Sequence, residues 1–210
     1  MNFRYPIFLD LKGKRCLVTG EGSEIPAKIR GLITAAANVV YVNPRAAAEI
    51  EELAARGEIR WERRDFQVRD LDSCFLVITD RADNSDVFRL AEEHGVLCNA
   101  VDDPEHCRFS FGSVHRQGDL TIAISTNGWA PAMAVRLRER LQREIGPEYA
   151  VFVELLKEAR GEIAGRISDF TARRQLWYKI VDSDVLSMLR AGQQEAAAKK
   201  IRDLIDEAGR

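Results

Sequence analysis

The sequence predicts an α/β fold in which a parallel sheet is followed by a small α+β segment and a helical C-terminal region. A short apolar run, Cys16–Val18, ends in a glycine turn and leads into a helical pattern. Apolar runs and helical patterns then alternate as far as Asp103, whereas only helical patterns follow Pro147. A strand, a glycine turn and a helix at the start of such an alternation are typical of a Rossmann-like parallel sheet.

Composition and charge narrow the classes of protein to consider. The 210 residues, 46% hydrophobic and 30% charged, allow one large globular domain or one domain with an extension. A net charge of -2 gives no support for binding nucleic acid or an anionic membrane. No apolar run approaches the ~20 residues that span a bilayer, and the N-terminus has no signal-peptide core. We therefore expect a cytoplasmic protein with no nucleic-acid and no membrane partner.

The four cysteines indicate a reducing compartment rather than a metal site. They form no CxxC pair and show no metal-ligand spacing, and the three histidines show none either. Cys16, Cys74 and Cys98 lie in or beside apolar runs, so we expect them to pack in the core. The sequence therefore predicts no bound metal.

The glycine turn is the first candidate binding site. Gly20 and Gly22 would let the backbone approach a pyrophosphate, and the following helix would offer free N–H groups to it. The turn therefore suggests four cofactor-binding candidates: Gly20, Glu21, Gly22 and Ser23. Three features oppose this interpretation, because Glu21 and Glu24 add negative charge and Ile25 stands where Gly or Ala is usual. The turn alone fits a βα connection that binds nothing equally well.

The remaining elements of the sheet follow in chain order. We expect helices at 27–37, 46–55 and 84–94, and strands at 38–42, 59–63, 74–78 and 96–101. Asn43 ends the second strand, where an acidic residue usually binds the ribose of NAD, and its uncharged amide leaves the choice between NAD and NADP open. Before the first strand, the apolar segment Ile7–Leu9 is expected to pack under the sheet.

Polar residues follow several of these strands. Thr79, Asn99 and Asp102 lie at or near the carboxyl ends of theirs, as Gly20 does. Ligands of open parallel sheets bind at this edge, so Thr79 and Asn99 are further cofactor-binding candidates. By itself, an Asp before Asp103–Pro104 is more typical of a turn than of a site.

The pattern changes after Asp103. Residues 109–116 and 120–125 alternate like paired strands, and residues 126–131 form a loop. An amphipathic helix carrying several arginines is expected at 132–145. The remainder reads as helical, with a break around 181–184.

Several of these motifs together resemble the precorrin-2 dehydrogenase/sirohydrochlorin ferrochelatase family, which includes stand-alone dehydrogenases and the N-terminal module of siroheme synthase. The order and spacing fit over roughly residues 3–145, and the tail around Arg173–Trp177 is similar to the helical region that follows in this family. The matching segments are Tyr5–Leu11, Val18–Gly22 with Lys28, Leu71–Ile78, Cys98–Pro104, Ile122–Pro131 and Arg136–Arg138.

The resemblance implies an oxidoreductase of siroheme, and thus porphyrin-type, biosynthesis that oxidises precorrin-2 to sirohydrochlorin with NAD. In some members it also implies insertion of ferrous iron, which the sequence leaves open here. Asp102 matches the key acidic position and is the catalytic candidate, with Asp103 as a turn former. The resemblance further implies a homodimer that exchanges strands and a helix from residues 109–145. We therefore divide the chain into an NAD-binding domain at 1–112, a dimerisation and substrate segment at 113–146 and a helical domain at 147–210.

The resemblance also implies substrate-binding residues in the second half of the chain. Ser125, Thr126 and Asn127 replace part of the family's Ser-Ser-Gly-Gly, so a loss of backbone freedom is expected at Asn127. The substrate is a polycarboxylate, for which Arg136 and Arg138 are candidates, although helical arginines usually form a solvated face.

Two other hypotheses remain. The glutamates and Ile25 of the glycine turn favour a sirohydrochlorin chelatase or tetrapyrrole-binding protein that has lost NAD binding. A ligand-sensing module acting through the helical tail is the third hypothesis.

Overall fold

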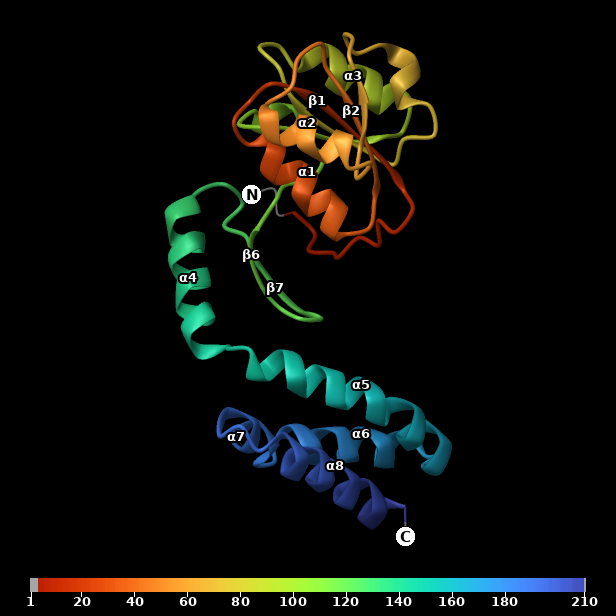
Figure 1. Cartoon of the computed structure of the whole chain (residues 1–210), viewed down its shortest axis with the longest axis vertical. Coiled ribbons are helices and arrows are strands. Elements are labelled where there is room, and N and C mark those ends of the chain that lie inside the picture. Colours follow the sequence, from red (N-terminus) through yellow and green to blue (C-terminus); the bar gives the residue numbers. More distant parts are fainter. Residues whose placement is uncertain (1–3, 210) are drawn as a thin grey trace. The chain divides into compact units, whose positions relative to one another are not determined.

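The computed structural model describes residues 4–209. Its contacts divide the chain into two compact units, one ending at Ser110 and the other beginning at Phe111. Figure 1 labels β1, β2 and α1 to α3 of the first unit, and β6, β7 and α4 to α8 of the second.

The first unit contains a five-stranded sheet with the order β3-β2-β1-β4-β5. All neighbouring strands are parallel, which confirms the predicted Rossmann-like sheet. The strands are β1 (Arg15–Gly20), β2 (Asn38–Val42), β3 (Arg60–Glu62), β4 (Leu76–Asp80) and β5 (Leu97–Ala100). The chain proceeds outward from β1 to β3 and then returns to the other side of β1 with β4. The order therefore reverses between β1 and β4, where open parallel sheets have their ligand crevice.

Helices and two short 3₁₀ turns connect these strands. They are α1 (Ile25–Thr34), α2 (Ala48–Ala55), α3 (Ser85–Glu93), η1 (Val68–Leu71) and η2 (Pro104–His106). One core cluster joins Cys16 and Val18 of β1 to Ile25 of α1, and another contains Leu17 of the same strand. The alternating side chains of β1 thus bury both faces of the sheet. Ile25 is itself fully buried, so close packing of α1 survives without Gly or Ala at this position.

Two local expectations are wrong. Ile7, Phe8 and Leu9 do not pack under the sheet: Phe8 is 76% exposed, and only the following Leu11 reaches the core. The strand expected from residue 109 begins only at residue 113. Residues 107–109 are instead tied to β5, because Arg108 N donates to the Cys98 carbonyl (2.8 Å) and Asn99 Nδ2 donates to the Phe109 carbonyl (2.8 Å).

The second unit begins with an antiparallel hairpin of β6 (Ser113–Gln117) and β7 (Leu120–Ile124). Helix α4 (Pro131–Glu144) contacts both strands. The buried ring of His115 in β6 lies with Nε2 2.9 Å from the Ile145 carbonyl oxygen, which ties the hairpin to the end of α4.

Four further helices share one hydrophobic core: α5 (Glu148–Arg166), α6 (Phe170–Val181), α7 (Val185–Arg190) and α8 (Gln194–Ala208). The expected break after Val181 is present, but those at 167–169 and 191–193 were not anticipated. The break at 167–169 ends at Asp169, whose carboxylate accepts a hydrogen bond from Ala172 N (2.7 Å) and so caps α6. Within residues 4–209, no helix combines the length and apolar character needed to cross a membrane.

Candidate functional site

The glycine turn follows β1 and lies against the end of β4. Gly20 has φ +108°, and a Cβ atom there would lie 2.1 Å from the backbone oxygen of Asp80. A Cβ atom on Gly22 would lie 1.5 Å from Oδ2 of the Asp80 side chain. Gly20 is therefore required by a neighbouring strand, and Gly22 by a neighbouring carboxylate. The turn thus lies so close to Asp80 that a Cβ atom at either glycine would overlap this residue.

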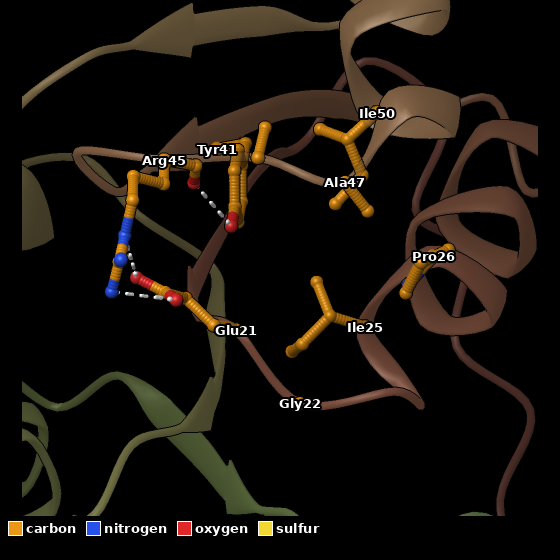
Figure 2. Close-up of a pocket in the computed structure, with 9 residues that line it drawn as sticks. Glu21, Gly22, Ile25, Pro26, Tyr41, Arg45, Ala47 and Ile50 are labelled. Atoms are coloured by element: carbon orange, nitrogen blue, oxygen red, sulfur yellow. Dashed lines mark hydrogen bonds and ion pairs between the residues drawn. The ribbon is translucent and has the colours of Figure 1, made fainter.

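Glu21 is held by residues at and just after the end of the neighbouring strand β2, and Figure 2 shows its pairing with Arg45. Its Oε1 accepts hydrogen bonds from Asn43 Nδ2 (3.1 Å) and Arg45 Nε (3.3 Å), and its Oε2 lies 3.2 Å from Arg45 Nη2. The hydrogen bond from Asn43, opposed by slight desolvation and assisted by Arg45, lowers the pKa of Glu21. Trp61 Nε1 donates to the Asn43 carbonyl (2.9 Å), which fixes the backbone of this corner.

A cavity of about 330 Å³ opens beside the same turn. Its lining residues are Glu21, Gly22, Ile25, Pro26, Tyr41, Arg45, Ala46, Ala47 and Ile50 (Figure 2). The Tyr41 hydroxyl is shared between the carbonyl oxygens of Gly20 (2.8 Å) and Arg45 (3.1 Å). Burial, together with the charge of Glu21, raises the pKa of Tyr41 to about 12, so this phenol is a neutral structural link.

Acidic side chains gather on the other side of the turn. Burial, the nearby carboxylates of Asp102 and then Glu24 raise the pKa of Asp80, and Lys28 partly opposes this. Asp80 was missed as a site residue in the sequence, where the expected strand ended at residue 78 and left Asp80 in the following loop. The available signal was its register: it ends β4 as Gly20 ends β1, and the two are paired.

Asp102 lies in the turn that follows β5. It is exposed and has φ +56°, a left-handed conformation that Asp adopts more readily than most residues. Its neighbour Asp103 is engaged, because its Oδ2 lies 2.7 Å from His106 Nδ1. Among the described residues, no side chain forms a hydrogen bond or ion pair with Asp102.

The side chains of Thr79 and Asn99 are used within the protein. Thr79 is fully buried and its hydroxyl donates to Asn84 Oδ1 (2.9 Å). Asn99 Nδ2 donates to the Phe109 carbonyl and lies 3.4 Å from Cys107 Sγ. Both residues therefore shape the loops at the edge of the sheet through hydrogen bonds. Ser23, by contrast, is exposed in the first turn before α1.

The other candidates lie in the second unit, in the loop after β7. Ser125 Oγ accepts a hydrogen bond from Asn127 N (3.1 Å), and Thr126 Oγ1 accepts one from Ala130 N (3.2 Å). Asn127 has φ +53° and Gly128 has φ +83°. Asn is the residue that best tolerates this conformation after glycine, so the loop keeps a glycine-like backbone at Asn127.

The two arginine candidates on α4 differ in their surroundings. Arg136 is exposed and pairs with Glu139 one turn later, with Nη1 2.7 Å from Oε2. Arg138 is half-buried, and its Nε is a buried donor with no hydrogen-bond acceptor in the described part of the chain. A buried N–H without a partner is unfavourable, so Arg138 is the better prepared of the two to bind a carboxylate.

The first unit has the features needed to hold a nicotinamide dinucleotide. Gly20 and Gly22 let backbone approach closely, but the first turn of α1 offers an anion few donors, because Ile25 N donates to the Gly22 carbonyl (3.1 Å) and Pro26 has no N–H. Glu21 offers a fixed carboxylate beside the end of β2. Asp80 and Glu24 weaken the fit, because they bring negative charge toward the pyrophosphate position.

Comparison with known families accounts for most of the chain. Residues 7–113 match the family described as "Putative NAD(P)-binding". Residues 117–144 match "Sirohaem biosynthesis protein central", and residues 148–205 match "Sirohaem synthase dimerisation region". The three matched segments follow one another along the chain without overlap.

Individual relatives agree with these matches. A siroheme synthase of Nitrosococcus oceani is 33% identical over 195 residues, covering 91% of this chain and 42% of the relative. A siroheme synthase of Neisseria meningitidis serogroup B is 33% identical over 211 residues, covering 99% of this chain and 44% of the relative. This chain therefore spans less than half the length of these curated relatives. The solved structure of SirC, a precorrin-2 dehydrogenase, aligns with a TM-score of 0.74 and 25% identity over 95% of this chain and 100% of SirC.

Proposed function

Since this chain belongs to the precorrin-2 dehydrogenase/sirohydrochlorin ferrochelatase family, which includes the N-terminal module of siroheme synthase, we propose that it oxidises precorrin-2 to sirohydrochlorin with NAD. The observation that supports this most directly is the glycine turn. It combines a Gly20 that the backbone of the neighbouring strand requires, a Gly22 that lies against the Asp80 carboxylate, and a glutamate carboxylate held beside the end of β2.

The reaction is a two-electron oxidation. Bound NAD would accept a hydride from the macrocycle, and a proton would leave with it. Asp102 is the residue proposed to take that proton, because its carboxylate is exposed at the carboxyl edge of the sheet while Asp103 is bound by His106. The protein's other task is to orient the two rings and to exclude water from them.

Substrate carboxylates are proposed to bind in the second unit. Arg138 is the main candidate because its Nε is a buried donor that lacks an acceptor among the described residues. Arg136 would first have to leave Glu139. The loop Ser125–Asn127, with its glycine-like backbone, would contribute hydroxyl and amide groups.

We also propose a homodimer. Within residues 4–209 the hairpin β6–β7 is a two-stranded sheet with no further strand at either edge, and such a hairpin is marginally stable alone. Large apolar side chains nearby in sequence are exposed, including Trp129 (90%), Met133 and Leu137. A light-scattering mass of the full chain tests this: twice the chain mass is expected, and a monomer at micromolar concentration would contradict it.

The catalytic proposal is tested by mixing the purified full chain with freshly prepared precorrin-2 under anaerobic conditions. Sirohydrochlorin should form only when NAD is added, as followed by absorbance. Asp102→Asn should lower the rate by about 10²–10⁴-fold, the usual contribution of a positioned acid or base. Asp65→Asn, which removes another exposed carboxylate, serves as the control and should leave the rate unchanged.

A second candidate function is a sirohydrochlorin chelatase or tetrapyrrole-binding protein without NAD turnover. It is favoured by Asp80, whose carboxylate lies against Gly22 where a pyrophosphate would approach. In the same experiment, this function would appear as no NAD-dependent change but faster insertion of ferrous iron into supplied sirohydrochlorin. NAD-dependent formation of sirohydrochlorin together with faster insertion of ferrous iron would indicate a bifunctional enzyme.

A further inference from the structure

The end of β2 carries an amide where dinucleotide-binding sheets that prefer NAD carry an acid. That acid normally binds the ribose hydroxyls, while a nearby Arg accommodates the 2′-phosphate of NADP. Here Asn43 occupies the acidic position, and Arg45 follows two residues later. The end of β2 by itself therefore lacks the acidic group that binds the ribose of NAD.

The structure adds an acid to this corner from a different element. The Glu21 carboxylate reaches across from the glycine turn and lies 3.1 Å from Asn43 Nδ2. Arg45 holds both of its oxygens, with Nε 3.3 Å from Oε1 and Nη2 3.2 Å from Oε2 (Figure 2). Asn43 is in turn fixed by its second hydrogen bond, from Nδ2 to the Arg45 carbonyl (2.7 Å). The carboxylate is therefore positioned by two partners at the place where the strand-end acid would be.

The arrangement also leaves Glu21 able to act. A carboxylate has about four acceptor positions, and Asn43 with Arg45 use only part of them. The Glu21 side chain is about half exposed and lines the cavity beside the turn, so the remaining lone pairs are accessible. Its partners favour the ionised form, which is the form that accepts hydrogen bonds from two hydroxyls.

We propose that Glu21 replaces the strand-end acid as the ribose-binding group of this chain, and that by occupying Arg45 it selects NAD over NADP. This inference rests on the proposed function and concerns the specificity of its cofactor. Glu21 would accept hydrogen bonds from the 2′- and 3′-hydroxyls of NAD. It would repel a 2′-phosphate, and the only cation in contact with it, within the described residues, is already paired with it.

Glu24, the other glutamate of the turn, provides a matched control because it pairs with Lys28 and not with Arg45. Glu24 lies three residues later, at the N-cap of α1, and its Oε2 is 3.6 Å from Nζ of Lys28 in that helix. Removing its charge should ease the approach of any pyrophosphate. NAD and NADP share the pyrophosphate, so Glu24→Gln should change the affinity for both by the same factor.

Direct binding separates these effects without relying on turnover. NAD and NADP are titrated by calorimetry into the full chain and into Glu21→Gln and Glu24→Gln at one fixed ionic strength. The wild type should bind NAD more tightly than NADP. Glu21→Gln should shrink that ratio by about tenfold or more, mainly by tightening NADP, since Arg45 becomes available to the 2′-phosphate. Adding Arg45→Ala to Glu21→Gln should remove the gain for NADP.

Three outcomes would overturn the inference. The first is a wild type that prefers NADP, and the second is a Glu21→Gln variant whose two affinities shift by the same factor, as expected for Glu24→Gln. In both, nicotinamide binding and thus the proposed function would stand. The third is a wild type that binds neither nucleotide, which would also remove the NAD-dependent function. If Glu21→Gln fails to fold, Arg45→Ala replaces it: NAD preference should persist with NADP weakened further, and a gain for NADP would refute the role of Arg45.

Discussion

The two glycines of the turn differ in what surrounds them, and this predicts different effects of the same substitution. In Gly20→Ala the new methyl would meet backbone, with the oxygen, carbon and nitrogen of Asp80 at 2.1, 2.4 and 2.8 Å. In Gly22→Ala its three nearest atoms would all belong to the Asp80 side chain, with Oδ2 at 1.5 Å. A backbone obstacle requires β1 and β4 to separate, whereas a side chain can rotate away.

The magnitudes follow from these contacts. Gly20 also has φ +108°, a conformation that costs a residue with a Cβ about 1–3 kcal/mol. Overpacking against the neighbouring strand adds about 1–3 kcal/mol, so Gly20→Ala should lower the free energy of unfolding by roughly 2–6 kcal/mol. Gly22→Ala should lower it by only about 1–2 kcal/mol, because moving the Asp80 carboxylate relieves the clash.

Urea unfolding of the apo protein measures the free energy of unfolding of both glycine variants. Adding Asp80→Ala to each variant then distinguishes a clash with the Asp80 side chain from a clash with its backbone. Combined with Gly22→Ala it should restore most of the loss, giving a strong favourable coupling in a double-mutant cycle. Combined with Gly20→Ala it should restore little, because the backbone of Asp80 remains. Equal rescue of both glycine variants, or of neither, would refute the assignment of one glycine to the backbone and the other to the carboxylate.

Two further substitutions test the charges that surround the site. Asp70 is buried and receives two hydrogen bonds from Arg64 (2.7 and 2.8 Å) and one from Gln67 N (2.8 Å), so Asp70→Asn should lower the free energy of unfolding by about 2–3 kcal/mol in urea. Burial raises the pKa of Asp70, but these hydrogen bonds outweigh burial and hold the pKa below 3.8. The stability that the Asp70 carboxylate contributes should therefore be present above that pH and be lost as pH falls through the lowered pKa. An Asp70→Asn variant with the same midpoint of acid unfolding as the wild type would contradict this. Asp80 has the opposite sign: its pKa is raised above 3.8, so the folded state binds its proton more tightly and stability falls as pH rises through that raised pKa. Asp80→Asn should therefore raise the free energy of unfolding at pH 7 by about 0.5–1 kcal/mol and have little effect near pH 3, and a destabilised variant at pH 7 would contradict it.

The sheet could be predicted from sequence because its signals are local. The central strands of the first unit are short apolar runs, whereas β3 alternates like an edge strand, and the alternation of strands with helical patterns indicates parallel pairing through right-handed crossovers. The apolar entry segment Ile7–Leu9 misled for the same reason. Its composition resembles a core strand, yet only Leu11 reaches the core, and no local pattern distinguishes these two outcomes.

The site was only partly predictable, because its decisive contacts join residues far apart in sequence. Gly20, Gly22 and Asn43 could be located by their places at strand ends. The position of Asp80 against Gly22 depends on β4 lying directly beside β1, a pairing that no single segment reveals. Asn127 shows the reverse case: its departure from glycine suggested a stiffer loop, but the backbone keeps a positive φ that Asn accommodates.

The two glutamates of the turn show that a negative charge in this motif does not always oppose cofactor binding. From sequence, Glu21 and Glu24 both oppose pyrophosphate binding. In the folded chain, Glu21 is drawn aside by Asn43 and Arg45, so its charge is paired and directed at the end of β2. Asp80 instead takes over the unfavourable role, since its charge lies against Gly22 with two other carboxylates nearby. Cofactor affinity should therefore depend on Asp80 and cofactor choice on Glu21, and separate substitutions at the two positions should change these properties independently.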